Sequence, residues 1–406
     1  MTALLLLLLF LISCSSPRPA TPPAADFLLV SGDSTYWVTS KPGGLDFRGS
    51  PLILARYGGR FHELYVVDDD DSYQDALLIG QTVFSRDLVT DDSTPIFGDT
   101  LIGRITRAYA AAHPDLDPLD PDEPVNDDPS LTATSDVTLL DEHGPYLSLE
   151  YHADTRHRPR PAFHTTWRAV IDMRTGRPVP LADLVGPAAA AAATARARRD
   201  FGALIDSARA SRAELPDLVP LLLNEARFDS TSYTIAPAGR ALAVQFAARL
   251  AGLRDAVDAL MLAPVTVQPP PAWWPGVAAT LPLRAGAGAW EWARPGYTVR
   301  AVRDTADSVL DLTVTDTARH VWRVGRVHEP LRHVFWMDQP RADSTTRRAL
   351  DRAFNDATFY DDDVHVARLR RAPRAAPRFR IAAARASSSP PRSAARRVER
   401  RRPTSP

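Results

Sequence analysis

The sequence predicts an α+β fold that is rich in antiparallel β-sheet, with a few packed helices, a disordered N-terminal tether and a disordered C-terminal tail. Three observations predict it. Short apolar or alternating runs recur between turn-forming residues over much of the chain. A few longer segments carry apolar residues at the helical spacing. The chain also holds 36 prolines in 406 residues, which favours many short connections over long helices.

The chain begins with an apolar run, ALLLLLLFLI at positions 3–12, and Cys14 is its only cysteine. A run of this length predicts a secretory signal peptide over residues 1–13, because it is too short to span a bilayer. The segment Leu11–Cys14 is similar to the lipobox of bacterial lipoproteins. That resemblance implies a lipidated Cys14, carrying palmitate or a similar acyl chain, as a membrane anchor. Ser15 follows the cysteine, which in that family implies the outer membrane.

Composition divides the chain into seven segments. We expect a signal peptide at 1–13, a flexible Pro/Ala/Ser tether at 14–25, and a β-rich domain with one helix at 26–130. An α+β domain follows at 131–268, a Pro/Trp-rich connection at 269–296, a β-meander with a C-terminal helix at 297–367, and a disordered basic tail at 368–406.

Each element of this expected body rests on a local pattern. Between 27 and 100, apolar runs separated by Gly, Pro and Asp turns predict strands at 27–30, 36–38, 52–55, 61–67, 76–79 and 82–84. A helix is expected from Leu101 to Ala112, with Ile105 and Ala108 on its buried face, and Pro114 ends it. Later strands are predicted at 137–140, 146–151, 167–173, 233–235, 241–246, 265–267, 298–302, 309–314, 321–327 and 333–337. An Ala-rich helix after Pro187, a short helix near 221–223 and a helix over 350–357 complete the expected body.

Charge is unevenly distributed along the chain. The net charge is −1, yet residues 368–406 hold 13 arginines and one glutamate. The remaining chain is therefore acidic, which argues against nucleic-acid binding by the folded body. The basic tail is expected to be disordered because it contains almost no apolar residues.

Residues 146–267 carry a second resemblance. The alternating strand Tyr146–Tyr151, the strand and turn Trp167–Arg177, and the segment Val179–Val185 follow one another in the order seen in a bacterial extracytoplasmic domain of unknown function. That domain occurs in lysozyme-sensing anti-sigma factors and in peptidoglycan deacetylases. The resemblance implies a non-catalytic binding or sensing module. The chain departs from the family where a Gly-Gly-Ala-His segment is usual, since His152–Pro159 stands there.

Three histidines and one aspartate are the candidate metal ligands. His152, Asp154, His157 and His164 fall within thirteen residues. Imidazoles and a carboxylate can bind zinc, but these spacings match no common ligand pattern, and neighbouring arginines oppose a cation. We expect an exposed polar hairpin tip here, no metal site and no cofactor, with zinc as the alternative.

Two acidic clusters raise the question of calcium. They are Asp68–Asp71 and the loop 115–128. Neither has the EF-hand spacing, so solvated loops are the expectation and calcium the alternative.

Four tryptophans are the candidate binding residues. Trp273, Trp274, Trp290 and Trp292 lie within twenty positions. Exposed indoles could stack on a glycan or anchor a protein contact. Packing between the middle and C-terminal segments is the expected role.

No catalytic motif is present. The sequence contains no nucleophile elbow, P-loop, dinucleotide fingerprint or His-Glu-x-x-His helix. The sequence therefore predicts a membrane-anchored envelope protein without catalytic residues, which binds peptidoglycan, another glycan or an envelope protein. One alternative is an envelope hydrolase that uses the His/Asp residues near 152–164. Another is a structural outer-membrane assembly factor.

Overall fold

The computed structural model describes residues 21–32, 34–120, 123–160, 162–210, 218–238, 241–248, 250–251, 260–267, 289–304, 309–328, 331–337 and 344–359. The predicted signal peptide, Cys14, Trp273, Trp274 and the tail 368–406 lie outside these residues. Among the helices of the described ranges, none has the length and apolar content needed to cross a membrane.

The predicted α+β class is wrong, because the protein is mostly β: 53% of the described residues are in strands and 22% in helices. The strands are longer than the apolar runs in the sequence predicted. For example, β5 (Arg60–Asp70) and β8 (Leu131–His143) extend well beyond their apolar parts, since polar residues occupy the more exposed positions. The predicted tether also ends early, because Ala25 is buried and its backbone N–H donates to Ser40 Oγ at 2.6 Å.

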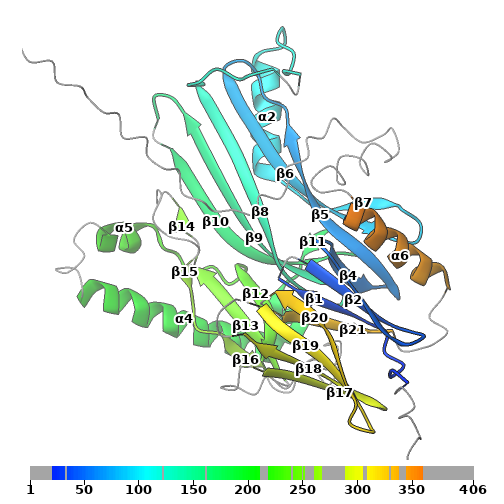
Figure 1. Ribbon diagram of the computed structural model, residues 1–406. Coiled ribbons are helices and arrows are strands. Elements are labelled where there is room, and N and C mark those ends of the chain that lie inside the picture. The colour runs from blue at the N-terminus through cyan, green and yellow to red at the C-terminus, as the bar shows by residue number, and fades with distance from the viewer. Residues whose placement is uncertain are drawn as a thin grey trace, which may run out of the picture.

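A nine-stranded sheet, here called the central sheet, forms the middle of the molecule (Figure 1). Its strand order is β11-β10-β9-β8-β6-β5-β4, with β7 beside β6 and β14 beside β10. The remaining bounds are β4 Ile53–Tyr57, β6 Ala76–Asp87, β7 Ser93–Gly98, β9 Tyr146–His157, β10 Phe163–Asp172, β11 Arg177–Pro178 and β14 Leu250–Ala251. The predicted boundary at 130/131 falls inside this sheet, because β6 pairs with β8.

Helix α2 (Thr100–Ala112) packs on the central sheet. Asp99 caps it by accepting hydrogen bonds from the backbone N–H groups of Leu101 and Ile102. Ile102 is buried in the sheet's apolar core. The helix lies between β7 and β8 in sequence, and the long connection allows the parallel pairing of β6 with β8.

A smaller sheet and three helices cover one end of the central sheet. The strands are β12 (Tyr233–Ala238), β13 (Ala241–Ala248), β15 (Leu260–Met261) and β16 (Val265–Val267). The helices are α3 (Leu181–Val185), α4 (Pro187–Ala210) and α5 (Leu218–Glu225). Ala190, Ala193 and Ala197 form the buried stripe of α4 and share a core with Phe246.

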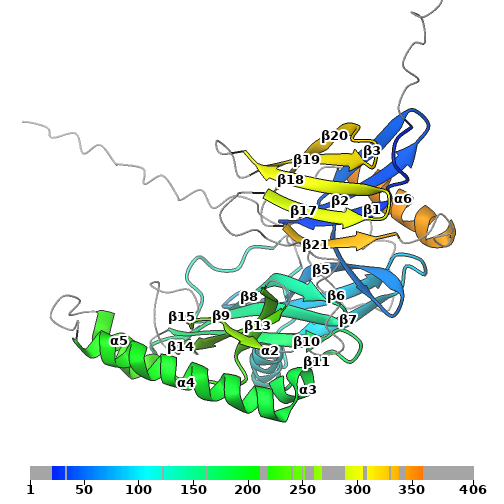
Figure 2. The same ribbon diagram turned by 90° about the horizontal axis from the view of Figure 1, so that it is seen from below.

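Both ends of the described chain form a two-sheet body, here called the terminal sandwich (Figure 2). One sheet has the order β21-β1-β2-β3 and the other β17-β18-β19-β20. The bounds are β1 Phe27–Ser31, β2 Ser34–Lys41, β3 Gly44–Ser50, β17 Ala289–Arg294, β18 Tyr297–Arg303, β19 Val309–Asp316, β20 Val321–His328 and β21 Leu331–Trp336. Helix α6 (Ser344–Phe359) inserts Leu350 and Phe354 against the outer face of the first sheet. Segments predicted as separate, 26–130 and 297–367, therefore share one sheet.

Candidate functional site

The β9–β10 hairpin brings three of the four sequence candidates together. In its antiparallel register, His152 is opposite Thr166 and Asp154 is opposite His164. His152 and Asp154 are two residues apart, so their side chains lie on the same face. The sequence spacing gave no recognisable ligand pattern because strand pairing, rather than local spacing, makes this group.

Asp154 lies between the two histidines of this hairpin group. His152 Nε2 is 3.3 Å from Asp154 Oδ1, and His164 Nδ1 contacts the same oxygen. His152 Nδ1 is 2.9 Å from Thr166 Oγ1. The side chains of His152 and Asp154 are 45% and 40% exposed. The group is therefore open to solvent and has the residue types of an acid–base or metal site.

The tip of the hairpin is exposed and basic. Arg156, His157 and Arg160 are exposed, and so is Phe163 at 46%. His157 is opposite Leu131 and is outside the group around Asp154. Arg158 forms an ion pair with Asp128, which connects the tip to the acidic loop. The tip thus presents an aromatic ring among positive charges.

The other sequence candidates are placed as follows. Trp290 and Trp292 are buried, at 7% and 3% exposed, in the core of the terminal sandwich. Their rings are therefore not available to stack on a surface ligand. In the first acidic cluster, Asp68 accepts a hydrogen bond from Gln81 at 2.8 Å, and Asp70 accepts one from Ser72 Oγ at 2.6 Å. These carboxylates form hydrogen bonds that stabilise the β5–β6 connection.

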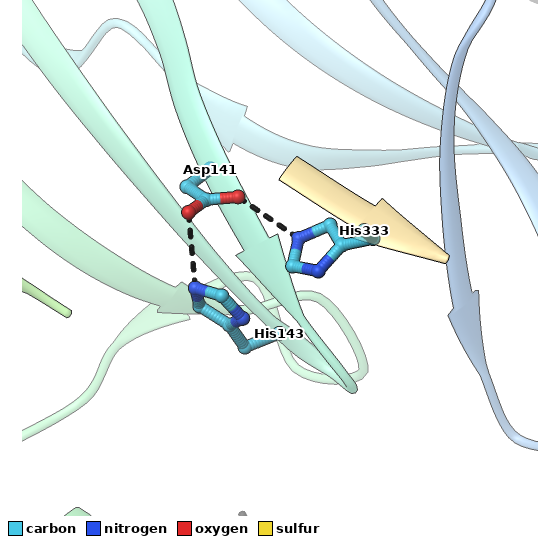
Figure 3. Close-up of side chains that lie close together, drawn as sticks. All are labelled: Asp141, His143 and His333. Carbon is cyan, nitrogen blue, oxygen red and sulfur yellow. Dashed lines mark ion pairs between the residues drawn. The ribbon is translucent and has the colours of Figure 1, made fainter. Parts of the chain in front are cut away.

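A second group, which the sequence did not predict, is buried between the central sheet and the terminal sandwich. It consists of Asp141 and His143 from the end of β8 and His333 from β21 (Figure 3). Asp141 Oδ2 is 3.1 Å from His143 Nε2, and Asp141 Oδ1 is 2.9 Å from His333 Nε2. The two imidazoles meet edge to face, with ring centroids 4.6 Å apart. We call this set the junction group.

The local sequence explains how β8 presents two of these side chains. Asp141 and His143 are two residues apart and so share a face of the strand. A β-bulge between Leu139 and Asp141 shifts the register against β9 just before them. After His143 the chain turns through Gly144, whose φ of 59° suits the first central residue of a two-residue hairpin turn.

Two further charged side chains border the junction group. Glu142 Oε1 is 3.6 Å from His333 Nε2, and Glu142 Oε2 is 3.9 Å from Arg332 Nη1. Arg332 Nη2 donates to the backbone carbonyl of Leu139 at 3.1 Å. The side chains of Glu142 and His333 are only 1% and 7% exposed. Glu142 and His333 are thus almost closed to solvent, whereas the Asp141 side chain is 18% exposed.

The electrostatics of the two carboxyl groups differ. Burial raises the pKa of Asp141, but the adjacent His143 and His333 outweigh it and hold that pKa well below its usual range. For Glu142, burial is the dominant influence and holds its pKa above the usual range, although His333 lowers it. Asp141 is therefore the carboxylate whose charge the two imidazoles stabilise.

His333 could not be found from local spacing. It comes from a strand that begins almost 190 positions after the end of β8. The available signals are a histidine inside the apolar strand LRHVFW and the polar Asp-Glu-His end of a strand otherwise rich in apolar residues. Neither signal indicates that the two segments lie in contact.

Comparisons with known proteins add no further constraint on these groups. Searches against protein-family models and against curated proteins find no match to this chain. The lipobox and the resemblance of residues 146–267 to the extracytoplasmic domain therefore stay predictions.

Proposed function

We propose that the chain is a lipoprotein of the bacterial cell envelope, anchored at Cys14 in the outer membrane, whose folded body is a non-catalytic binding or sensing module. The observation that carries the proposal is the tip of the β9–β10 hairpin, where Phe163 is 46% exposed and Arg156 and Arg160 are also exposed. The resemblance of residues 146–267 to a domain of lysozyme-sensing anti-sigma factors supports the same role.

The chemistry of the tip favours peptidoglycan among the envelope components. Arginine guanidinium groups pair with carboxylates, which the peptide stems of peptidoglycan provide. An exposed aromatic ring packs against the apolar face of a sugar. Arg156, Arg160 and Phe163 together offer both kinds of contact to one polymer.

The position of the tip suits a protein held on a membrane. In Figure 1 the tip of the β9–β10 hairpin lies at the upper left, whereas β1, which follows the predicted tether, lies at the lower right. An anchor at Cys14 would attach close to the terminal sandwich. The hairpin tip would then point away from the anchored end.

Co-sedimentation with purified peptidoglycan sacculi tests this proposal. The full-length protein, solubilised in detergent, is expected to sediment with sacculi. A triple variant of the tip, Arg156→Gln, Arg160→Gln and Phe163→Ala, should lower the bound fraction by about 10-fold, because two ionic contacts and one aromatic contact are lost.

A matched control removes the same kinds of group elsewhere. Arg319→Gln, Val321→Ala and Arg323→Gln change an exposed basic hairpin of the terminal sandwich, where Val321 is 64% exposed. This variant should sediment like the parent protein. Equal sedimentation of the tip variant and the parent, or no sedimentation of the parent, contradicts the proposal.

A hydrolase is the second candidate, because the structure brings His152, Asp154 and His164 together. A carboxylate between two imidazoles can orient one of them as a general base. The combined variant His152→Ala, Asp154→Asn and His164→Ala discriminates between the candidates. Loss of peptidoglycan hydrolysis with retained sedimentation supports the hydrolase, and an absence of hydrolysis by the parent protein rejects it.

A further inference from the structure

The junction group has the spacing of metal ligands. The three donor atoms of Asp141, His143 and His333 lie within 4.8 Å of one another, and the closest carboxylate–imidazole separations are 2.9 and 3.1 Å. Zinc bonds of about 2.0–2.2 Å place neighbouring ligand atoms of a tetrahedral site roughly 3.3 Å apart. The two carboxylate–imidazole separations therefore already match those of a tetrahedral site to within a few tenths of an ångström.

Hydrogen bonding leaves some buried polar atoms of the group and its border unsatisfied. Among the described residues, His333 Nε2 and both oxygens of Glu142 are buried and have no hydrogen-bond partner of acceptable geometry. Buried polar atoms in native proteins are nearly always satisfied. Here polar atoms lie close together with no N–H group directed from one to another. This arrangement is expected where their lone pairs bind a cation.

The ligand types select the class of metal. Two imidazole nitrogens and a carboxylate suit zinc and its transition-metal neighbours, whereas calcium and magnesium prefer oxygen ligands. Glu142 Oε1, 3.6 Å from His333 Nε2, borders the three-residue group.

We propose that Asp141, His143 and His333 bind one divalent transition-metal ion of the zinc class. His143 and His333 are buried and the Asp141 side chain is 18% exposed, so the site is mostly shielded from solvent. The ion joins β8 of the central sheet to β21 of the terminal sandwich, independently of the function proposed for the hairpin tip.

A bound ion would stabilise the contact between the central sheet and the terminal sandwich. Within the described part of the chain, β21 pairs with β1 and with no other strand, so His333 and Arg332 connect an edge strand to the central sheet. An ion that binds only the assembled site stabilises that assembly.

Metal uptake by the full-length protein tests the proposal. The protein is stripped with a chelator and dialysed against Zn²⁺, and bound metal is measured by mass spectrometry. All measurements use the background variant His164→Ala, so that the hairpin group contributes no ion. We expect one tightly bound zinc per chain and a rise in thermal midpoint of about 5 °C or more at saturating metal.

Two ligand variants and one control identify the site. His333→Gln and Asp141→Asn keep side-chain size and should weaken zinc binding at least ~100-fold, since even indirect partners of a ligand contribute about 10–100-fold. His320→Ala removes an exposed histidine paired with Asp316 and should leave binding unchanged. Circular dichroism verifies that each variant folds.

The spectrum of bound Co²⁺ provides a readout that needs no ligand variant. Intense visible bands of tetrahedral Co²⁺ in the His164→Ala protein are expected. Undiminished zinc binding by folded Asp141→Asn, no zinc uptake by the His164→Ala protein, or only the weak spectrum of hydrated Co²⁺ would each overturn the proposal.

Discussion

At the scale of single residues, the protein uses the same side-chain types in two opposite environments. His152, Asp154 and His164 form a half-exposed group on a hairpin, whereas Asp141 and His143 are joined by His333 in a mostly buried position. An exposed imidazole–carboxylate group exchanges protons and ligands freely with water. A closed one is costly to leave without a countercharge, so it fixes the elements that contribute to it.

The proposed membrane location of the protein depends on Cys14. Cys14→Ala should abolish acyl labelling and move most of the protein from the membrane to the soluble fraction, because a lipid chain provides the proposed anchor. Metabolic labelling with a palmitate analogue, followed by membrane fractionation, measures this. Ser16→Ala is the control and should remain membrane-bound. Full labelling of Cys14→Ala contradicts the lipobox prediction.

The two His/Asp groups show what a sequence can reveal about a site. His152, Asp154 and His164 are recognisable as candidates because one hairpin contains all of them. Their contact still depends on register, which the residue types do not specify. His333 meets β8 through tertiary packing of a distant strand, and no local pattern encodes that meeting.

At the scale of elements, a glycine fixes how the two sheets of the terminal sandwich approach each other. A Cβ atom at Gly325 of β20 would lie 2.5 Å from Phe47 Cε1 of β3. The Phe47 ring cannot easily move, because it stacks on Tyr36 with centroids 5.4 Å apart. The small residue therefore permits the close contact between β20 and β3.

Two glycine substitutions should change stability in opposite directions. Gly325→Ala should lower the free energy of unfolding by about 1–3 kcal/mol through overpacking. Gly202→Ala, in α4 where no atom lies within 4 Å of the added Cβ, should raise it by about 1 kcal/mol. Urea denaturation monitored by circular dichroism measures both. Equal effects of the two substitutions would contradict the packing described for β20.

Elements were predictable where the pattern was local. The helix expected at Leu101–Ala112 is confirmed as α2, Thr100–Ala112. Of its expected buried face, Ile105 packs against the sheet core, whereas Ala108 is exposed and Ile102 is the buried residue. Strand lengths were underestimated because solvent-facing positions carry no apolar signal.

At the scale of the whole molecule, the two ends of the described chain pair with each other in the terminal sandwich. Phe27 of β1 is opposite Trp336 of β21, although some 300 residues separate them. Such pairing is set by the burial of both strands in a common core, and sequence patterns do not specify it. The junction group then connects the terminal sandwich to the central sheet. This connection is central to how the two bodies are held together.

A crystal structure of the full-length protein grown with Zn²⁺, with data collected on both sides of the zinc absorption edge, tests that connection most directly. The account predicts an anomalous difference peak about 2.0–2.2 Å from Asp141, His143 and His333. A structure in which these side chains are in place and the only anomalous peaks lie elsewhere, for example at the hairpin group, would contradict it.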